Sequence, residues 1–294
     1  MKFDFKKTIK LSSLLLSTLF IFTFCDSTDP IIPGGNNNSQ PSEVSKGIEV
    51  PALKGGSNNL FISHSTILNG TKTLTYCLEY DCTKRQSRWV AFTFYNATAA
   101  LGSGRTDAWA NDPDVPAEYR ASRSDFSGYD RGHLCASYDR QYSVEANEQT
   151  FYYSNMSPQI GNFNQNIWAT LESQVQKWGR NSSFRDTLYV VKGGTIDSPK
   201  DILTYTDRGS FPLPVPKYYF MAILCKKGTE RKAIAFWLEH KAGYQKPYDF
   251  KQYAISIDEL EQKTNIDFFV NLPDDIERKV EAELDTSYNT WPGL

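Results

Sequence analysis

The chain has 294 residues, of which 40% are hydrophobic and 14% aromatic, with 32 basic against 34 acidic residues and a formal net charge of −2. This composition excludes an intrinsically disordered chain, which would be poor in apolar residues and rich in charge. It also disfavours a protein that holds nucleic acid through a large excess of positive charge.

The first 24 residues have the pattern of a secretory signal. Four lysines lie within residues 1–10, and an uncharged, mostly apolar run occupies residues 11–24. This run is shorter than the roughly 18 residues that a membrane-spanning helix needs. Cys25 follows it directly, as in a bacterial lipoprotein signal, although Phe24 is larger than the usual preceding residue. We expect an extracytoplasmic protein of the bacterial cell envelope, anchored by a lipid on Cys25, or a secreted one cleaved elsewhere.

A tether is expected over residues 25–55, because residues 26–47 are rich in Pro, Gly, Asn and Ser and show no apolar period. Without residues 1–24 the chain keeps 28 basic and 33 acidic residues, a net charge of −5. Residues 56–294 have the pattern of one folded domain.

The predicted elements of this domain begin with a β-hairpin at 73–80 and 88–95, two segments rich in β-branched and aromatic residues. Residues 96–130 form a polar stretch without a period, and so long a loop is usually functional. Apolar spacing predicts a helix over 162–178, then strands at 188–192, 218–225 and 232–238. Capping-box patterns at 256–259 and 274–277 predict two closing helices. We therefore predict an α+β fold, with a largely antiparallel sheet flanked by helices.

Four cysteines follow Cys25. Cys77 and Cys82 are close enough in sequence to close a small disulfide loop, and Cys135 and Cys225 are either free or paired. Their spacing is not that of a structural zinc site.

A candidate general base lies in the run Asp130-Arg131-Gly132-His133. His133 can accept a proton from water, Arg131 can bind a phosphate with two parallel hydrogen bonds, and Gly132 permits a tight bend. Asp130 is expected to shape this segment. The two other histidines, His64 and His240, are expected to be structural.

Asn164 and Glu172 lie eight residues apart on the predicted helix. This spacing separates them by about 12 Å along the axis and leaves them within about a quarter turn of one face. Asn164 can then bind a cation directly while Glu172 holds the cation's water molecules, an arrangement typical of Mg²⁺.

In these motifs the chain resembles the DNA/RNA non-specific endonucleases, the sugar-non-specific branch of the ββα-metal (His-Me finger) nucleases. The matching stretches are RWVAF at 88–92, DRGH at 130–133, SNMSPQ at 154–159 and NFNQNIWATLE at 162–172. Weaker matches extend the resemblance over about residues 60–285. It implies a ββα-metal active-site motif and hydrolysis of phosphodiester bonds of DNA and RNA, with Mg²⁺, Mn²⁺ or another divalent cation and 5′-phosphate products.

The resemblance also implies the site residues: the general base His133, the direct metal ligand Asn164, Glu172 for the metal-bound water, and the phosphate-stabilising residues Arg131 and Arg105. Two positions depart from the family pattern. Gln176 stands where some members have an arginine, and Cys135 replaces a small residue or proline. These departures bear on substrate binding and rate.

Two other functions are compatible with the sequence. The first is a catalytically silent surface lipoprotein that binds nucleic acid or another ligand, and the second is a phosphodiesterase for smaller substrates. The presence of both His133 and the metal-site residues disfavours the silent protein. Arg120, Arg123 and Arg140 are expected on a solvated or ion-paired surface, and contact with the nucleic acid backbone is the less favoured alternative for them.

Overall fold

The computed structural model describes residues 43–294. The predicted signal segment and Cys25 lie outside the described residues. Among the residues described, no helix is long and apolar enough to cross a membrane. The tether was predicted to extend to residue 55, which lies beyond the start of the folded part. Val50 is buried in the core and the amide of Ala52 donates to the carbonyl of Asp267, so the folded part begins before that boundary.

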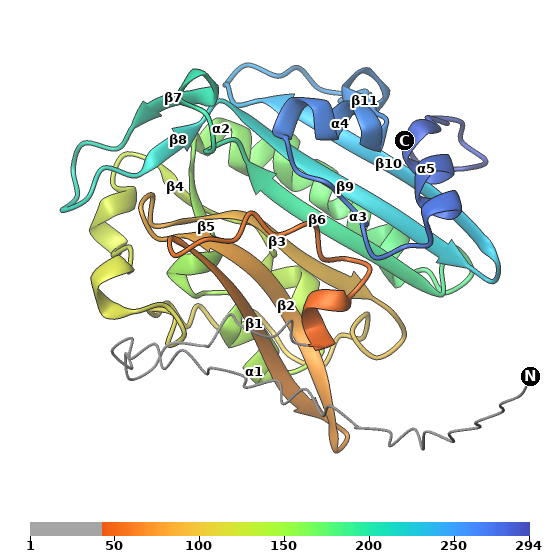
Figure 1. Ribbon diagram of the computed structural model, residues 1–294, viewed down its shortest axis with the longest axis horizontal. Helices are drawn as coiled ribbons and strands as arrows, with labels where there is room; N and C mark the ends of the chain where they lie inside the picture. Colours follow the sequence, from red (N-terminus) through yellow and green to blue (C-terminus); the bar gives the residue numbers. More distant parts are fainter. Residues whose placement is uncertain (1–42) are drawn as a thin grey trace, which may run out of the picture. The chain divides into compact units, whose positions relative to one another are not determined.

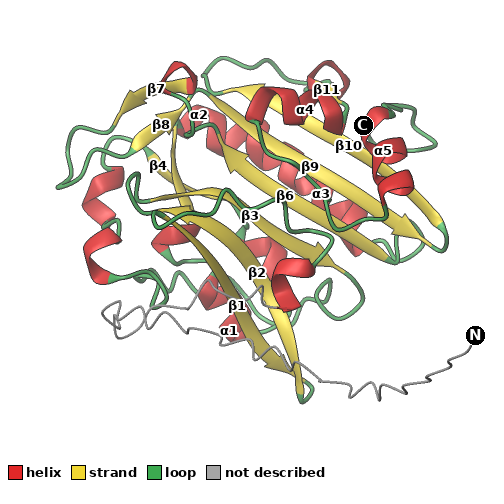
Figure 2. Ribbon diagram, viewed as in Figure 1, coloured by secondary structure: helices red, strands yellow, loops and turns green. Residues whose placement is uncertain are grey.

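A seven-stranded antiparallel sheet forms the centre of the fold, in the order β1-β2-β3-β6-β9-β10-β11 (Figures 1 and 2). Its strands are β1 (Asn59–Leu68), β2 (Thr71–Asp81), β3 (Gln86–Phe94), β6 (Thr187–Gly194), β9 (Tyr218–Lys227), β10 (Glu230–Glu239) and β11 (Ala254–Ile255). All the strands predicted from the sequence lie in this sheet, and the predicted hairpin is β2 paired with β3. The prediction of an α+β fold is confirmed.

Two short antiparallel pairs lie outside the main sheet. They consist of β4 (Asp130–His133) with β5 (Met156–Gln159), and of β7 (Ile202–Tyr205) with β8 (Pro214–Pro216). The helices are α1 (Val144–Gln149), α2 (Gly161–Phe163), α3 (Ala169–Arg180), α4 (Ile257–Thr264) and α5 (Asp274–Ala282).

Alternation along the strands gives the sheet two buried faces. On β3, Phe92 and Phe94 pack with α3, whereas Trp89 and Ala91 belong to the core beneath α4 and α5. Helix α3 therefore covers one face of the sheet, and α4 with α5 covers the other (Figure 1).

The helix predicted over 162–178 is divided into α2, a π-helical turn (Asn164–Trp168) and α3. Such turns insert an extra residue into the helical repeat and often occur at functional sites. Helix α4 begins as predicted, with the Ser256 hydroxyl accepting from the Glu259 amide. The capping box predicted at Asp274 is wrong, because Asp274 is already the first helical residue and follows Pro273, which has no side-chain acceptor.

The four described cysteines are buried free thiols. Cys77 lies in the core on the α4 side of the sheet and Cys82 in the core on the α3 side. Since successive side chains of a strand point to opposite faces, the sheet itself separates these two thiols.

Candidate active site

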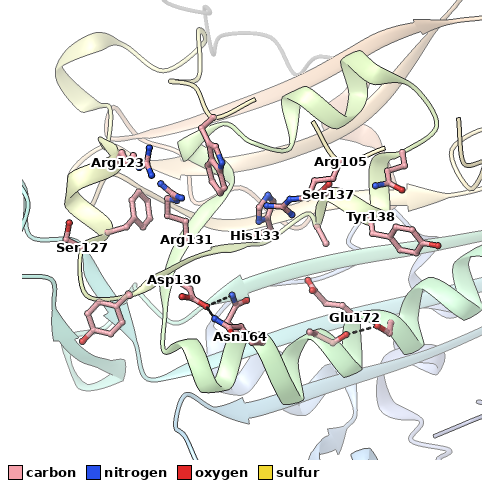
Figure 3. Close-up of a pocket in the computed structure, with 18 of the residues that line it drawn as sticks. Arg105, Arg123, Ser127, Asp130, Arg131, His133, Ser137, Tyr138, Asn164 and Glu172 are labelled. Carbon is pink, nitrogen blue, oxygen red and sulfur yellow. Dashed lines mark hydrogen bonds between the residues drawn. The ribbon is translucent and has the colours of Figure 1, made fainter. Parts of the chain in front are cut away.

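A cavity of about 1180 Å³ brings the five predicted site residues together. Figure 3 shows Arg105, Arg131 and His133 facing Asn164 and Glu172 across it. One wall is β4 with the long loop before it, and the other is the π-helical turn with α3. The predicted functional loop is thus part of the cavity wall.

Asp130 joins the two walls. Its Oδ2 atom accepts hydrogen bonds from Asn164 Nδ2 at 3.0 Å and from Gln165 Nε2 at 2.8 Å (Figure 3). Strand β4 is thereby tied to the start of the π-helical turn. Because the Asn164 amide nitrogen is committed to Asp130, the amide oxygen is the atom left to bind a ligand. No described residue donates a hydrogen bond to it.

Gly132 is required for close packing rather than for the tight bend expected from the sequence. It lies in β4, opposite Ser157 of β5. A Cβ atom at this position would lie 2.0 Å from Oε1 and 2.6 Å from Cγ of Gln159, whose side chain is fully buried. Only glycine lets β4 lie this close to β5, and β4 carries His133.

His133 is held between aromatic rings. Its imidazole lies 5.6 Å from the ring of Trp109 and 5.0 Å, edge to face, from that of Phe151. Its Nε2 atom is buried without a hydrogen-bond partner among the described residues. Desolvation, with a further contribution from the charge of Arg105, lowers the pKa of His133 to about 3. The ring is therefore neutral at pH 7 and able to accept a proton.

Glu172 is fixed by a buried charge network that the sequence did not predict. Lys192 Nζ lies 2.9 Å from Glu172 Oε1 and 3.2 Å from Asp139 Oδ2, and Gln176 Nε2 donates to Asp139 Oδ1 at 2.8 Å. Burial raises the pKa of Glu172 against the opposing charge of Lys192. Burial also opposes the charge on Lys192, but the two carboxylates outweigh it and raise its pKa.

Lys192 was missed although its signal is visible in the sequence. It is the one charged residue of the stretch YVVKGG at 189–194, within strand β6. A single lysine in an otherwise apolar buried strand needs a carboxylate partner, and here it has two.

Three arginines line one end of the cavity. The Arg131 guanidinium lies 3.9 Å from the Trp109 ring centroid, and that of Arg105 lies 4.8 Å from the Phe151 ring centroid. Partial burial lowers the pKa of Arg131, and the charges of Arg123 and Arg105 lower it further. In the described part of the chain, no carboxylate forms an ion pair with Arg123 or Arg131. Arg105 pairs with the exposed Asp107 at 2.9 Å, and an anion is the natural partner for the other two.

The expectation of a surface position holds for Arg123 and fails for Arg140. Arg123 is exposed but lines the cavity. Arg140 is fully buried, with Nη1 donating to the carbonyl of Thr93 at 3.0 Å and its guanidinium 4.6 Å from the ring centroid of Phe92. The expectation for Arg140 was wrong because the aromatic core, and not water, accommodates its planar cation.

The two remaining histidines make structural contacts. His64 Nε2 lies 3.0 Å from Asp112 Oδ2, which also accepts from Ser154, and Asp112 Oδ1 accepts from the amide of Asp114. These contacts anchor the loop that carries Trp109. Although His64, Asp112 and Asp114 lie close enough to share a cation, hydrogen bonds already occupy both Asp112 oxygens. His240 accepts from the Ile160 amide and faces the Pro216 carbonyl.

Known proteins are similar to this chain over most of its length. The model of the DNA/RNA non-specific endonuclease family matches residues 56–275. A nuclease of Nostoc sp. is 29% identical over 222 residues, which cover 71% of this chain and 76% of the relative. The human mitochondrial endonuclease G is 27% identical over 206 residues, or 67% and 68% of the two chains. The mitochondrial nuclease EXOG of Xenopus laevis is 28% identical over 234 residues, which cover 74% of this chain and 64% of the relative.

The fold is also found in a solved structure. A chain of the crystal structure of the EndoG/EndoGI complex superposes with a TM-score of 0.63 at 21% identity, covering 82% of this chain and 96% of that one. The family match extends from the first strand of the main sheet to the start of α5 and includes every residue of the cavity. The protein therefore belongs to the DNA/RNA non-specific endonuclease family.

Proposed function

We propose that this endonuclease hydrolyses phosphodiester bonds of both DNA and RNA, with Mg²⁺ as its cation and neutral His133 as general base, and leaves 5′-phosphate ends. The observation that carries the proposal is the meeting, in one cavity, of a neutral imidazole, an amide oxygen without a partner and three arginines.

The side chains present suit a hard divalent cation. Asn164 offers its amide oxygen, oriented by Asp130, and Glu172 lines the same cavity with its carboxylate held by Lys192. Proteins usually bind Mg²⁺ through a few oxygen ligands, and the ion keeps several of its water molecules. When bound, the cation would supply positive charge to the reacting phosphate and its leaving oxygen.

The chain's own groups supply the proton transfer and the binding of the phosphate. His133 accepts the proton of the attacking water, and a bound phosphodiester brings negative charge that raises the basicity of the imidazole. Arg131, Arg105 and Arg123 bind the phosphate oxygens, with Arg131 held in place by Trp109. Contacts to phosphate carry no base information, which accounts for action on both kinds of nucleic acid.

The size of the cavity favours a polymer over a small phosphodiester. At about 1180 Å³ it exceeds the roughly 300–1,000 Å³ of typical small-molecule pockets. The catalytically silent alternative is disfavoured because His133, Asn164 and Glu172 are all present and share one cavity.

Digestion of plasmid DNA and of RNA tests the proposal. Wild-type protein should degrade both with Mg²⁺ and neither with EDTA. His133→Ala should lower the rate about 10²–10⁴-fold, because the general base is lost. Asn164→Ala should also be nearly inactive, whereas Asn166→Ala, which removes an amide that bonds only within its own helix, should retain activity.

No cleavage by the wild type with any divalent cation would contradict the enzyme. Activity that survives His133→Ala would contradict the mechanism, and 3′-phosphate products would contradict the direction of cleavage.

Lys192→Met tests the network behind Glu172. The buried carboxylates of Glu172 and Asp139 would lose the lysine ammonium that they share, so the free energy of unfolding should fall by about 3–5 kcal/mol. Nuclease activity of the folded fraction should fall about 10–100-fold, since Glu172 is no longer oriented. Lys227→Met, which breaks an exposed pair with Asp186, should change the unfolding free energy by less than about 0.5 kcal/mol. Denaturant titration and plasmid nicking measure both effects; a fully active Lys192→Met would exclude the orienting role.

We also propose an extracytoplasmic location with a lipid anchor on Cys25. The support is the basic and then apolar pattern of residues 1–24, with a cysteine at its end. Feeding a labelled lipid precursor to a bacterial host should label the wild type and place it in the membrane fraction, whereas Cys25→Ser should be unlabelled. An unlabelled, water-soluble mature wild type would rule out the anchor.

A further inference from the structure

A second group of acidic side chains lies away from the cavity, on helices α4 and α5. Asp258 and Glu261 come from α4 and Glu281 from α5, and one carboxylate oxygen of each lies within 4.8 Å of the others. These helices cover the face of the sheet opposite α3, so the group shares no residue with the candidate active site.

Glu281 distinguishes this group from an ordinary acidic surface. Its side chain is only 6% exposed, and its Oε1 atom is buried without a hydrogen-bond partner among the described residues. An ionised carboxylate without a partner is costly to bury. The ion pair on α4 joins Lys263 to Glu259, which lies on the exposed side of the helix. Among the described residues, no lysine or arginine forms an ion pair with the three acidic side chains of the group. The group therefore lacks a positive charge.

Without a cation, the surroundings disfavour a negative charge on Glu281. Burial, and then the charges of Glu261, Glu277, Asp267 and Asp258, raise the pKa of Glu281 to about 9. Burial also raises the pKa of Glu261 to about 7. Residues 257–283 contain nine acidic and three basic residues, whereas the whole of residues 43–294 contains 31 and 28. This short segment is thus more negative than the described chain as a whole.

We propose that Asp258, Glu261 and Glu281 form a second divalent-cation site, suited to Ca²⁺, which links α4 to α5. Ca²⁺ accepts six to eight oxygens in flexible geometry at about 2.3–2.6 Å, so three carboxylate oxygens that lie within 4.8 Å of one another can share one such ion. Mg²⁺ requires a smaller and more regular octahedron. The carboxylate of Glu261 is already oriented, because its Oε1 accepts from the Phe268 amide at 2.8 Å.

The competing explanation is a pair of carboxyl groups that share a proton. Glu281 would then be neutral and satisfied by Glu261, and Ca²⁺ would have no effect. The cation site predicts the opposite, since binding brings the missing positive charge and stabilises the folded state in proportion to the logarithm of Ca²⁺ concentration.

Thermal unfolding of the full-length mature protein, stripped with EDTA and titrated with CaCl₂, distinguishes the two. An Asn164→Ala background removes binding at the active site. In this background Ca²⁺ at a hundredfold excess over its Kd should raise Tm by on the order of 5 °C. Adding Glu281→Gln should abolish the shift, and adding Glu259→Gln, the same charge change on the exposed side of α4, should preserve it. Calorimetry should find one Ca²⁺ per chain in the Asn164→Ala protein and none once Glu281→Gln is added.

Asp258→Asn provides a second test if Glu281→Gln does not fold, and it should weaken the shift. A Ca²⁺ shift that is unchanged in Glu281→Gln, or that is missing from Asn164→Ala alone, overturns the site. Mg²⁺-dependent nuclease activity of Glu281→Gln in an otherwise wild-type chain should equal that of the wild type, so this result stands apart from the proposed function.

Discussion

The candidate site depends on one hydrogen-bonded carboxylate, that of Asp130. It lies on the same short strand as Arg131 and His133 and accepts hydrogen bonds from Asn164 and Gln165 on the facing helix. A four-residue strand and a π-helical turn are both weak elements, and neither position follows from local propensity. The Asp130 contacts fix their separation, and with it the distance between the imidazole and the amide oxygen. They also select which end of the Asn164 amide faces the cavity.

Basic side chains of the protein gather where a phosphate would bind. A net charge near zero argues against binding nucleic acid through the whole surface. Instead, Arg105, Arg123 and Arg131 gather at one cavity, where aromatic rings position two of them. Much of the negative charge lies in residues 257–283, on the other side of the sheet. Separation of charge, rather than its total, lets a mildly acidic protein bind a polyanion.

Sequence patterns predicted the parts of the molecule that depend on local periodicity. The β2–β3 hairpin, strands β6, β9 and β10, and the apolar face of α3 all follow from side-chain alternation or helical spacing. The convergence of His133, Asn164 and Glu172 followed from motifs together with a family resemblance. Strands β4 and β5 were missed because four residues are too few to show a period.

The errors at Lys192, Arg140 and Gly132 arise from tertiary packing. Lys192 enters the site because β6 passes beside α3, and Arg140 is buried because Phe92 and Phe94 accept its cation. The tight bend expected at Gly132 was also wrong. Glycine is needed there because the Gln159 side chain packs against it, and this side chain comes from a strand more than twenty residues away. Such contacts join residues far apart in the chain and leave no mark in a local window of sequence.

The most direct test of this account is a double-mutant cycle between Asp130 and Asn164, read as kcat/KM for plasmid cleavage with Mg²⁺. Asp130→Ala alone should lower kcat/KM about 10–100-fold, because Asn164 loses the contact that orients it. In an Asn164→Ala background, the same Asp130 substitution should have almost no further effect, since the residue through which it acts is already gone. Losses that multiply in the double variant would show that the two residues act independently, and would contradict the account.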